Sequence, residues 1–244
     1  MKQGIFTIAE NVPLTESVYK MRLVGDVSDI TAPGQFINIK LDGLFLRRPI
    51  SVCDRDDATV TILYKVVGEG TKRLSRMKEG KLDVLTGLGN GYDTDLSGDA
   101  PLLLGGGVGV PPLYLLAKKL ISQGKKVTVI LGFNTKDEIF YEKEFQALGA
   151  KVLVTTVDGS YGISGFVTDA MKDLSYTYFY TCGPEPMLKA IFRTSETSGQ
   201  LSFEERMGCG FGACMGCSCK TVTGYKRICK EGPVLQKEEI LWEK

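Results

Sequence analysis

The alternation of apolar and polar residues changes character near residue 100. Before that point, short alternating runs rich in β-branched residues lie between Gly, Pro and Asp. They predict strands at residues 5–10, 18–24, 35–41, 60–66 and 81–85 and one short helix at residues 71–77. Many short strands with little helix favour a small closed β-barrel.

After residue 100 the pattern becomes one of buried strands alternating with amphipathic helices. It predicts strands at residues 102–104, 126–131, 151–157 and 178–182, and helices at residues 110–122, 140–147, 166–172 and 185–194. This order is typical of a doubly wound α/β domain, which binds ligands at the carboxyl ends of its parallel strands.

The connection at residues 87–99 is rich in Gly and Asp and is the best candidate for a domain boundary. We therefore divide the chain into a barrel at residues 1–98, an α/β domain at 99–200 and a C-terminal subdomain at 201–244. The last part has little room for a core of its own. We expect it to be held by packing against the other two and by whatever its cysteines bind.

Five of the seven cysteines lie in that C-terminal part. Cys209, Cys214 and Cys217 follow a Cys-x4-Cys-x2-Cys spacing, and Cys229 comes twelve residues later. Plant-type [2Fe–2S] clusters use this pattern, in which one tight loop supplies three thiolates and a later segment the fourth. Structural zinc and free thiols are the alternatives, and Cys219 competes with Cys217 as a ligand. We predict that the first four are the ligands.

Composition removes several classes of function. Thirty basic and twenty-nine acidic residues leave a net charge of +1, which gives no electrostatic reason to expect nucleic acid or a membrane surface as partner. The first residues lack the apolar core of a signal peptide and no apolar run reaches membrane-spanning length, so we expect a cytoplasmic protein. The chain has no histidine, which excludes histidine-based catalysis and leaves the chemistry to cofactors.

Two turns in the α/β domain have the composition of a dinucleotide site. Residues 102–112 read LLLGGGVGVPP, a strand that enters a glycine-rich turn and then a helix whose N-terminus favours anions. Close packing also demands glycine, so this turn alone is weak evidence. A second predicted strand ends in TCGPEPM at residues 181–187. Two such turns at strand ends of one parallel sheet predict a crevice for a dinucleotide.

In the barrel, Arg48 and Ser51 flank Pro49 and Ile50 in the segment RRPIS. A guanidinium and a hydroxyl so placed suit a phosphate beside a flat ring. The segment GEGT at residues 68–71 opens the predicted short helix and is a second phosphate-binding turn. Read in isolation, paired arginines such as these are more often a solvated surface pair.

Taken together, the order RRPIS, GEGT, GGGVG and CGPEPM resembles the ferredoxin–NADP reductase superfamily over about residues 1–200. The C-terminal segments ERMGCGFGACMGCSCKT and KRICKEGPVL narrow the resemblance. With them, the chain resembles the family of iron–sulfur flavoprotein subunits of bacterial NAD-dependent dihydroorotate dehydrogenases. In that family the cluster cysteines have the spacing found here.

This resemblance implies a β-barrel FAD domain, a doubly wound nucleotide-binding domain and a small [2Fe–2S] subdomain. It implies FAD binding at Arg48, Pro49, Ile50, Ser51, Leu63, Tyr64, Lys65, Gly70 and Thr71. It implies NAD(H) binding at Gly105, Gly106, Gly107, Val108, Gly109, Cys182, Gly183, Pro184 and Met187.

The function so implied is electron transfer between NAD(H) and the FMN of a partner through FAD and the cluster, which supports oxidation of dihydroorotate to orotate in pyrimidine biosynthesis. The implied partner is an FMN-containing catalytic subunit, in a heterotetramer of two plus two. No residue of this chain is expected to act as a catalytic acid or base. The alternatives are a ferredoxin- or hydrogenase-linked NAD(P) reductase subunit and, in another class, a flavin and cluster redox sensor.

Overall fold

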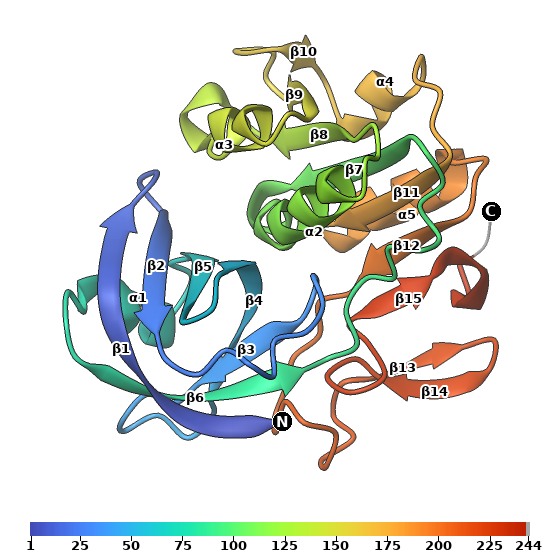
Figure 1. Cartoon of the computed structure of the whole chain (residues 1–244). Helices are drawn as coiled ribbons and strands as arrows, with labels where there is room; N and C mark the ends of the chain where they lie inside the picture. The colour runs from blue at the N-terminus through green and yellow to red at the C-terminus, as the bar shows by residue number, and fades with distance from the viewer. Residues whose placement is uncertain (243–244) are drawn as a thin grey trace.

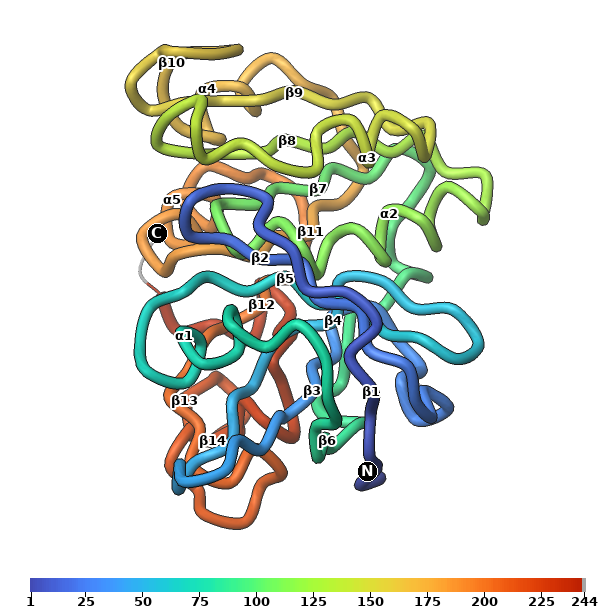
Figure 2. Tube along the Cα trace, turned by 90° about the vertical axis from the view of Figure 1, so that its left-hand side faces the viewer, coloured from blue at the N-terminus to red at the C-terminus, as the bar shows by residue number. Residues whose placement is uncertain are grey.

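The computed structural model describes residues 1–242, which form a β-barrel, a parallel α/β sheet and a C-terminal segment that lies against both (Figure 1). Figure 2, turned by a quarter turn, shows the sheet stacked above the barrel and the C-terminal hairpin beside the barrel. Within residues 1–242, no helix has the length and apolar character needed to cross a membrane.

The barrel is closed by six antiparallel strands in the order β1-β2-β5-β4-β3-β6. The strands are β1 (Lys2–Pro13), β2 (Val18–Val24), β3 (Phe36–Ile39), β4 (Arg48–Arg55), β5 (Thr59–Lys65) and β6 (Lys81–Leu88), with the short helix α1 (Glu69–Arg76) between β5 and β6. Five of these strands and the helix confirm the pattern-based prediction. The pattern missed β4, because its first residues include a proline.

Strand β4 is paired in an unusual way that leaves its first half open on one edge. Residues Arg48–Ser51 pair with β3, whereas pairing with β5 begins only at Val52. Pro49 has no N–H to give to a strand on the free edge, so a proline is tolerated there. The segment RRPIS therefore starts a strand of the barrel and also has an edge available for a ligand.

The α/β domain is a seven-stranded sheet in the order β10-β9-β8-β7-β11-β12-β15. Its strands are β7 (Pro101–Gly106), β8 (Thr128–Phe133), β9 (Lys151–Thr156), β10 (Ile163–Ser164), β11 (Tyr178–Cys182), β12 (Gly199–Ser202) and β15 (Val234–Gln236). Its helices are α2 (Pro111–Ser122), α3 (Glu142–Ala147), α4 (Val167–Met171) and α5 (Glu185–Thr194), with short 3-10 turns η1 (Gly107–Gly109), η2 (Lys136–Glu138) and η3 (Lys237–Glu239). The predicted doubly wound domain is confirmed, and β12 and β15 extend it beyond the prediction.

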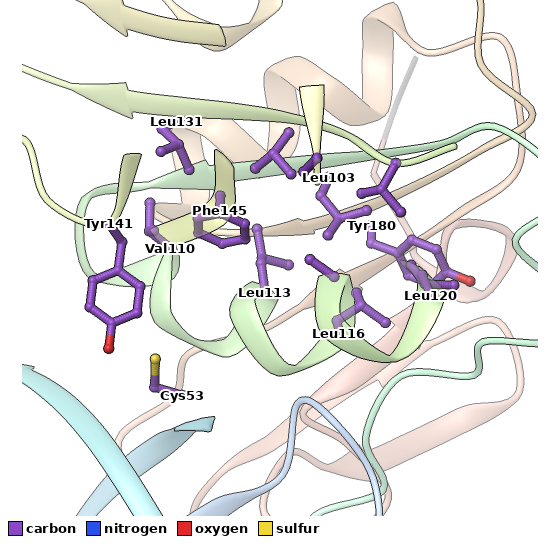
Figure 3. Packing of buried hydrophobic residues seen from close by; sticks show 14 of the residues in the cluster. Cys53, Leu103, Val110, Leu113, Leu116, Leu120, Leu131, Tyr141, Phe145 and Tyr180 are labelled. Carbon is purple, nitrogen blue, oxygen red and sulfur yellow. The ribbon is translucent and has the colours of Figure 1, made fainter. Parts of the chain in front are cut away.

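One side of this sheet is covered by α2, whose buried leucines Leu113, Leu116 and Leu120 face Leu103 and Leu131 (Figure 3). The same apolar cluster includes Val18, Cys53 and Leu63 of the barrel. This cluster therefore joins the barrel to the sheet, while the interior of the barrel has a separate core.

The C-terminal segment has no separate core, as predicted. Strand β12 is parallel to β11, and β15 is antiparallel to β12, so the segment begins and nearly ends as strands of the sheet. Between them is a two-stranded hairpin of β13 (Ser218–Thr221) and β14 (Gly224–Arg227). The buried Cys217 and Cys229 belong to the apolar cluster that contains Phe36 of the barrel and Leu102 of the sheet. The division at residue 200 stays a proposal, and residues 243–244 of the proposed subdomain lie outside the described part.

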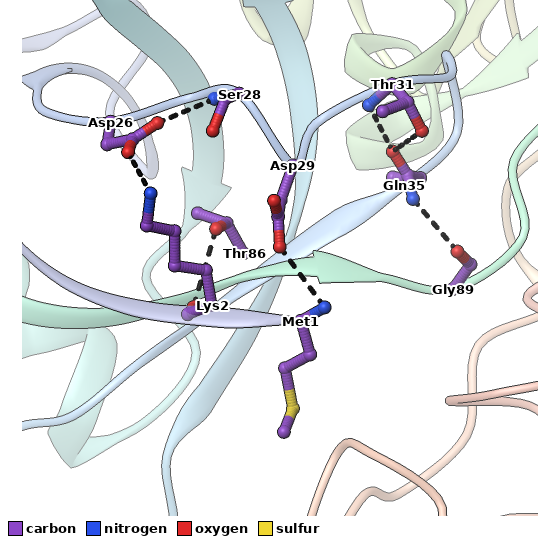
Figure 4. Close-up of polar contacts among 9 residues, drawn as sticks. All are labelled: Met1, Lys2, Asp26, Ser28, Asp29, Thr31, Gln35, Thr86 and Gly89. Carbon is purple, nitrogen blue, oxygen red and sulfur yellow. Dashed lines mark hydrogen bonds and ion pairs between the residues drawn. The ribbon is translucent and has the colours of Figure 1, made fainter.

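The connection at residues 87–99 is anchored to both main parts by a few buried residues. The Tyr92 hydroxyl donates a hydrogen bond to the Thr181 carbonyl at 3.0 Å, and its ring lies edge-on against Tyr180 at 5.6 Å. At the start of the connection, the Gln35 side chain donates to the Gly89 carbonyl at 3.0 Å and accepts from the Thr31 N–H (Figure 4). The connection thus fixes the sheet relative to the barrel.

We expect Tyr92→Phe to lower the midpoint of thermal unfolding by about 2–4 °C, because one buried hydrogen bond contributes about 1 kcal/mol. Calorimetry measures this. Tyr225→Phe is the control, since Tyr225 is 71% exposed on β14 and makes no side-chain hydrogen bond among the described residues. Equal midpoints for Tyr92→Phe and the unchanged chain would show that the hydroxyl does not hold the connection.

Candidate functional site

A cavity of about 690 Å³ lies where the barrel, the sheet and the C-terminal segment meet. Pro49 and Leu46 come from the barrel and Gly183 from the turn after β11. Met207 and Cys219 come from the C-terminal segment. Ligand sites have volumes of about 300–1,000 Å³ and often occur between domains, so this cavity is the candidate site. It joins three segments that the sequence assigned to three different cofactors.

The barrel wall of the site brings Arg48 to the N-terminus of α1. A Cβ atom added to Gly70 would lie 2.1 Å from Arg48 Nε, so the guanidinium lies directly over this glycine. The Thr71 hydroxyl accepts hydrogen bonds from the N–H groups of Val67 and Gly68, at 3.0 and 3.3 Å, and stabilises the turn that begins the helix. A guanidinium beside a helix N-terminus is a phosphate-binding arrangement. Arg48 therefore lies beside Gly70 and Thr71, and a role of these residues in FAD binding stays a prediction.

The predicted residues of β5 are placed less favourably. Leu63 is buried in the core shared with the sheet. The Tyr64 ring is buried inside the barrel, where its hydroxyl donates to Asn11 Oδ1 at 2.9 Å and burial raises its pKa to about 12. Only the Lys65 side chain is exposed. The side chains of Leu63 and Tyr64 are therefore not available to a ligand.

Ser51 and Ile50 continue β4 beyond Pro49. Ser51 is half-buried and stands opposite Phe36, on the outer face of the barrel. Ile50 alternates to the other side and packs against the barrel core. Of these two side chains, Ser51 is the one on the face where Pro49 lines the cavity.

The nucleotide side of the site lies at the switch point of the doubly wound sheet. Strands β8 and β9 follow β7 in one direction, and β11 and β12 lie on its other side. The turns after β7 and β11 are in contact, because a Cβ atom on Gly109 would lie 2.2 Å from the Cys182 carbonyl oxygen. Likewise, a Cβ atom on Gly106 would lie 2.6 Å from Met187 Sδ. Dinucleotides bind in crevices at such a point.

Packing thus explains part of the glycine-rich turn. Gly105, like Gly106 and Gly109, has no room for a side chain, since its Cβ atom would lie 2.9 Å from Val110. Gly107 differs, because it has a φ of +51° and open space around it, and the next residue, Val108, is exposed. Gly107 and Val108, before α2, are therefore the part of this turn that has room for a ligand. Beside it, burial raises the pKa of the Cys182 thiol to about 12, which keeps it neutral.

The four predicted cluster cysteines lie in two pairs. Cys209 contacts Cys214, and the Cys229 N–H donates to Cys217 Sγ at 3.4 Å. Within residues 1–242, no three His, Cys, Asp or Glu side chains converge on a single point that would hold one metal ion. A [2Fe–2S] cluster has two irons, each held by two cysteines, so two pairs fit its ligand set better than a zinc site.

Of the four predicted ligand sulfurs, the one of Cys209 accepts the most backbone hydrogen bonds within the described residues. Burial raises its pKa, but the hydrogen bonds that it accepts outweigh burial and bring the pKa to about 6. The backbone donors are the N–H groups of Phe211, Ala213 and Cys214, at 3.5, 3.2 and 3.4 Å. These groups favour the thiolate, which is the form that binds iron.

Cys219 belongs to neither of these pairs. It lies on β13, opposite Lys226, and lines the cavity beside Met207. Burial raises the pKa of its thiol, which favours the neutral form. This arrangement is consistent with four cluster ligands and a separate fifth thiol.

Two residues near the cysteines were not singled out from the sequence. Asn38 Nδ2 donates to the Cys209 carbonyl at 3.3 Å, and Arg227 Nη1 donates to the Gly212 carbonyl at 2.6 Å. The signal for Asn38 was a lone polar residue in the apolar run Phe36–Ile39. Arg227 had no such signal, because charged residues in a short hairpin are common.

Two family models match the chain. The iron–sulfur cluster binding domain of dihydroorotate dehydrogenase B matches residues 204–241, and the oxidoreductase NAD-binding domain matches residues 103–193. Among curated proteins, the dihydroorotate dehydrogenase B (NAD(+)) electron transfer subunit of Fusobacterium nucleatum is 46% identical, with 98% of this chain and 99% of the relative covered. The subunit of the same name from Geobacillus sp. is 43% identical, with 99% of each covered.

Solved structures agree on the fold. A chain of the NADH-dependent reduced ferredoxin–NADP oxidoreductase is 32% identical, with a TM-score of 0.88 over 98% of this chain and 90% of that chain. A ferredoxin NADP+ reductase from Neisseria gonorrhoeae with bound FAD and NADP is 19% identical, with a TM-score of 0.69 over 80% of this chain and 90% of that chain. The second similarity concerns the fold alone.

For the cysteines, we expect serine at position 209, 214, 217 or 229 to reduce or abolish the absorbance, the electron paramagnetic resonance (EPR) signal and the bound iron of a [2Fe–2S] cluster. Each substitution would remove one of the two thiolates from one iron. Cys219→Ser is the matched control and should keep the signal. Loss of the cluster in Cys219→Ser together with its retention in Cys217→Ser would reverse the assignment.

For the barrel, we expect Arg48→Ala to weaken FAD binding by about ten- to hundredfold, because a charged hydrogen bond contributes about 1.5–3 kcal/mol. Flavin fluorescence during dilution measures the dissociation constant. Arg22→Ala, which removes an exposed arginine from β2, is the control and should bind FAD normally. The same dissociation constant in both variants would return Arg48 to the solvated surface.

Proposed function

This chain belongs to the family of electron transfer subunits of dihydroorotate dehydrogenase B (NAD(+)), and on that premise we propose which of its residues serve each step. It is an oxidoreductase subunit of the ferredoxin–NADP reductase-like superfamily. It links NAD to a catalytic subunit by means of FAD and an iron–sulfur cluster, in pyrimidine biosynthesis.

The observation that carries the assignment of residues is the shared cavity. Pro49 of the flavin segment, Gly183 of the nucleotide segment and Met207 of the cluster segment line the same 690 Å³ space. A hydride requires direct contact between donor and acceptor, and single electrons require close redox centres. One cavity bordered by all three segments would bring the three redox centres near one another.

On the barrel, Arg48 and the N-terminus of α1 at Gly70 and Thr71 would hold the FAD phosphates, and Pro49 and Ser51 would contact the ring system. Bound FAD supplies the conversion between a two-electron hydride and single electrons. The contribution of the chain is to bind and orient. Support comes from the position of Arg48 over Gly70 and from the free edge of β4.

On the sheet, Gly107 and Val108 would bind the pyrophosphate of the nucleotide, and Cys182, Gly183 and Pro184 would border the nicotinamide. The turn after β9 favours NAD over NADP. Asp158 in that turn accepts hydrogen bonds from the Ser160 N–H and hydroxyl, which hold its pKa below the usual value, so it is ionised and would repel a 2′-phosphate.

In the C-terminal segment, Cys209 and Cys214 would bind one iron of a [2Fe–2S] cluster and Cys217 and Cys229 the other. The supporting observation is their arrangement in two pairs. Cys209 and Cys214 belong to the more exposed pair, whereas Cys217 and Cys229 are buried against the sheet. Electrons would therefore leave the chain on the side of the exposed pair.

The surface beside that pair supports a docking role. Phe211 is 42% exposed and Met215 is 53% exposed. Met207, four residues before Phe211, is partly buried and lines the cavity instead. Apolar side chains grouped at the surface mark interfaces. We infer that the FMN-containing catalytic subunit docks here, in a heterotetramer of two plus two. Reduced cysteines support a cytoplasmic location.

The second candidate function is electron exchange with ferredoxin, the protein that the name of the reduced ferredoxin–NADP oxidoreductase with the TM-score of 0.88 includes. That structure is 32% identical, against 46% for the Fusobacterium subunit. The higher identity and the match of the cluster domain favour the dihydroorotate dehydrogenase. A hydrogenase partner or a sensor role has no specific supporting contact.

We expect the isolated chain to reduce artificial acceptors with NADH and to leave dihydroorotate unchanged. Addition of the FMN-bearing catalytic subunit should give NAD-dependent oxidation of dihydroorotate in a stable heteromer. Phe211→Lys and Met215→Lys should weaken this heteromer at least about tenfold, since a charge buried in an interface costs more than 1.4 kcal/mol. Sedimentation and turnover are the measurements.

The control is Ile5→Lys, which places the same charge on an exposed apolar position of β1. All three variants should keep NADH oxidation by artificial acceptors. Efficient reduction of ferredoxin, without binding of the dihydroorotate dehydrogenase subunit, would support the second candidate instead.

A further inference from the structure

We infer that Asn38 is a positioning residue that holds the cluster loop (residues 208–216) against the side of the barrel that carries Pro49, the proposed flavin wall. By doing so it sets the reduction potential of the cluster. This inference rests on the proposed function, because it concerns the path between FAD and the cysteines. No cysteine spacing or nucleotide motif includes Asn38, which lies about 170 residues before the cluster loop.

Strand β3 places Asn38 on the outer face of the barrel. Its neighbours Ile37 and Ile39 point into the barrel core, so Asn38 points outward. Directly opposite Asn38 on β4 is Pro49, which lines the cavity. Asn38 is therefore the cross-strand partner of a residue in the proposed flavin wall.

The same side chain contacts the cluster loop. Its Nδ2 donates to the Cys209 carbonyl at 3.3 Å, and a Cβ atom added to Gly210 would lie 2.3 Å from that nitrogen. Gly210 also has a φ of +78°, which favours glycine. The peptide between Cys209 and Gly210 is thus pressed against Asn38. This peptide leads into the turn whose N–H groups bind the Cys209 sulfur.

Energetics argue that stability alone does not explain an amide here. Asn38 is 1% exposed, and its Oδ1 has no hydrogen-bond partner within the described residues. A buried unsatisfied acceptor costs about 1–3 kcal/mol, and leucine has nearly the same shape without that cost. Among residues 1–242, the side-chain hydrogen bond that leucine would lose is the one to the Cys209 carbonyl.

The expected consequence concerns the cluster. N–H donors to thiolate sulfur stabilise the additional negative charge of a reduced cluster and raise its potential. A loop released from Asn38 would hold these donors less well, so the potential would fall. Electron transfer from flavin to cluster would then be less favourable, whereas hydride transfer from NADH to FAD would not change.

The test uses the full chain loaded with FAD and cluster, as Asn38→Leu and Asn38→Ser. EPR-monitored redox titration should show the flavin–cluster electron equilibrium shifted about tenfold toward the flavin, equivalent to about 59 mV for a one-electron centre. After rapid mixing with NADH, reduction of the cluster should slow by about tenfold, the usual effect of losing a contact around a metal ligand. Flavin bleaching should keep its rate.

Leucine is apolar and serine is polar. The two variants together therefore separate the effect of the lost hydrogen bond from the effect of a change in local polarity. The control is Asn90→Ala. Asn90 also joins the barrel side to the C-terminal segment, through hydrogen bonds to the Val234 carbonyl and N–H at 2.7 and 3.1 Å, but it does not contact the cluster loop. It should lower the unfolding midpoint and leave the potential unchanged.

An unchanged potential and unchanged cluster reduction in both Asn38 variants would overturn the inference, as would an equal shift in Asn90→Ala. Failure of the proposed function has a different signature. In that case the unsubstituted chain itself would show no cluster that NADH reduces.

Discussion

The contact between the outer face of the barrel and the cysteine-bearing segment is the interaction on which the redox arrangement depends. Phe36 shares an apolar cluster with Cys217 and Cys229, and two positions along the same strand Asn38 holds the Cys209 carbonyl. Both cysteine pairs are thereby fixed to strand β3, which pairs with Pro49 and Ser51 of β4. Without the contact between this face of the barrel and the cysteine-bearing segment, the proposed flavin site and the proposed cluster site would lie apart.

The C-terminal segment has no alternative source of rigidity. A segment of this size cannot bury enough apolar surface to fold alone. It is instead anchored at both ends in the sheet, through β12 and β15, and in the middle by burial of two cysteines. The cysteines thus contribute to packing as well as to ligand binding. This explains why the burial differs between the two pairs, with one pair facing the core and the other the surface.

Close packing also shapes the turns at the switch point of the sheet. The glycines after β7 are mostly required because the turn after β11 lies against them. That close approach places Cys182 and Gly183 beside the cavity, while Gly107 and Val108 remain free for a ligand. Tyr92 holds this edge of the sheet on the barrel, so the nucleotide and flavin segments keep a constant relation.

The sequence by itself determined the class of each part and the identity of the chemistry. Periods of two and 3.6 residues are local properties, so the barrel strands and the α/β alternation were predictable, and the spacing of Cys209, Cys214, Cys217 and Cys229 is likewise a local pattern. The paired arrangement of these cysteines, the burial of the Tyr64 side chain and the contact between Asn38 and the Cys209 carbonyl were not predictable in this way. They depend on contacts between residues far apart in the chain, and strand β4, with Pro49 at its free edge, is recognisable only when its neighbours in the barrel are known. Tertiary structure decided these features because burial and hydrogen-bond partners are properties of the assembled fold.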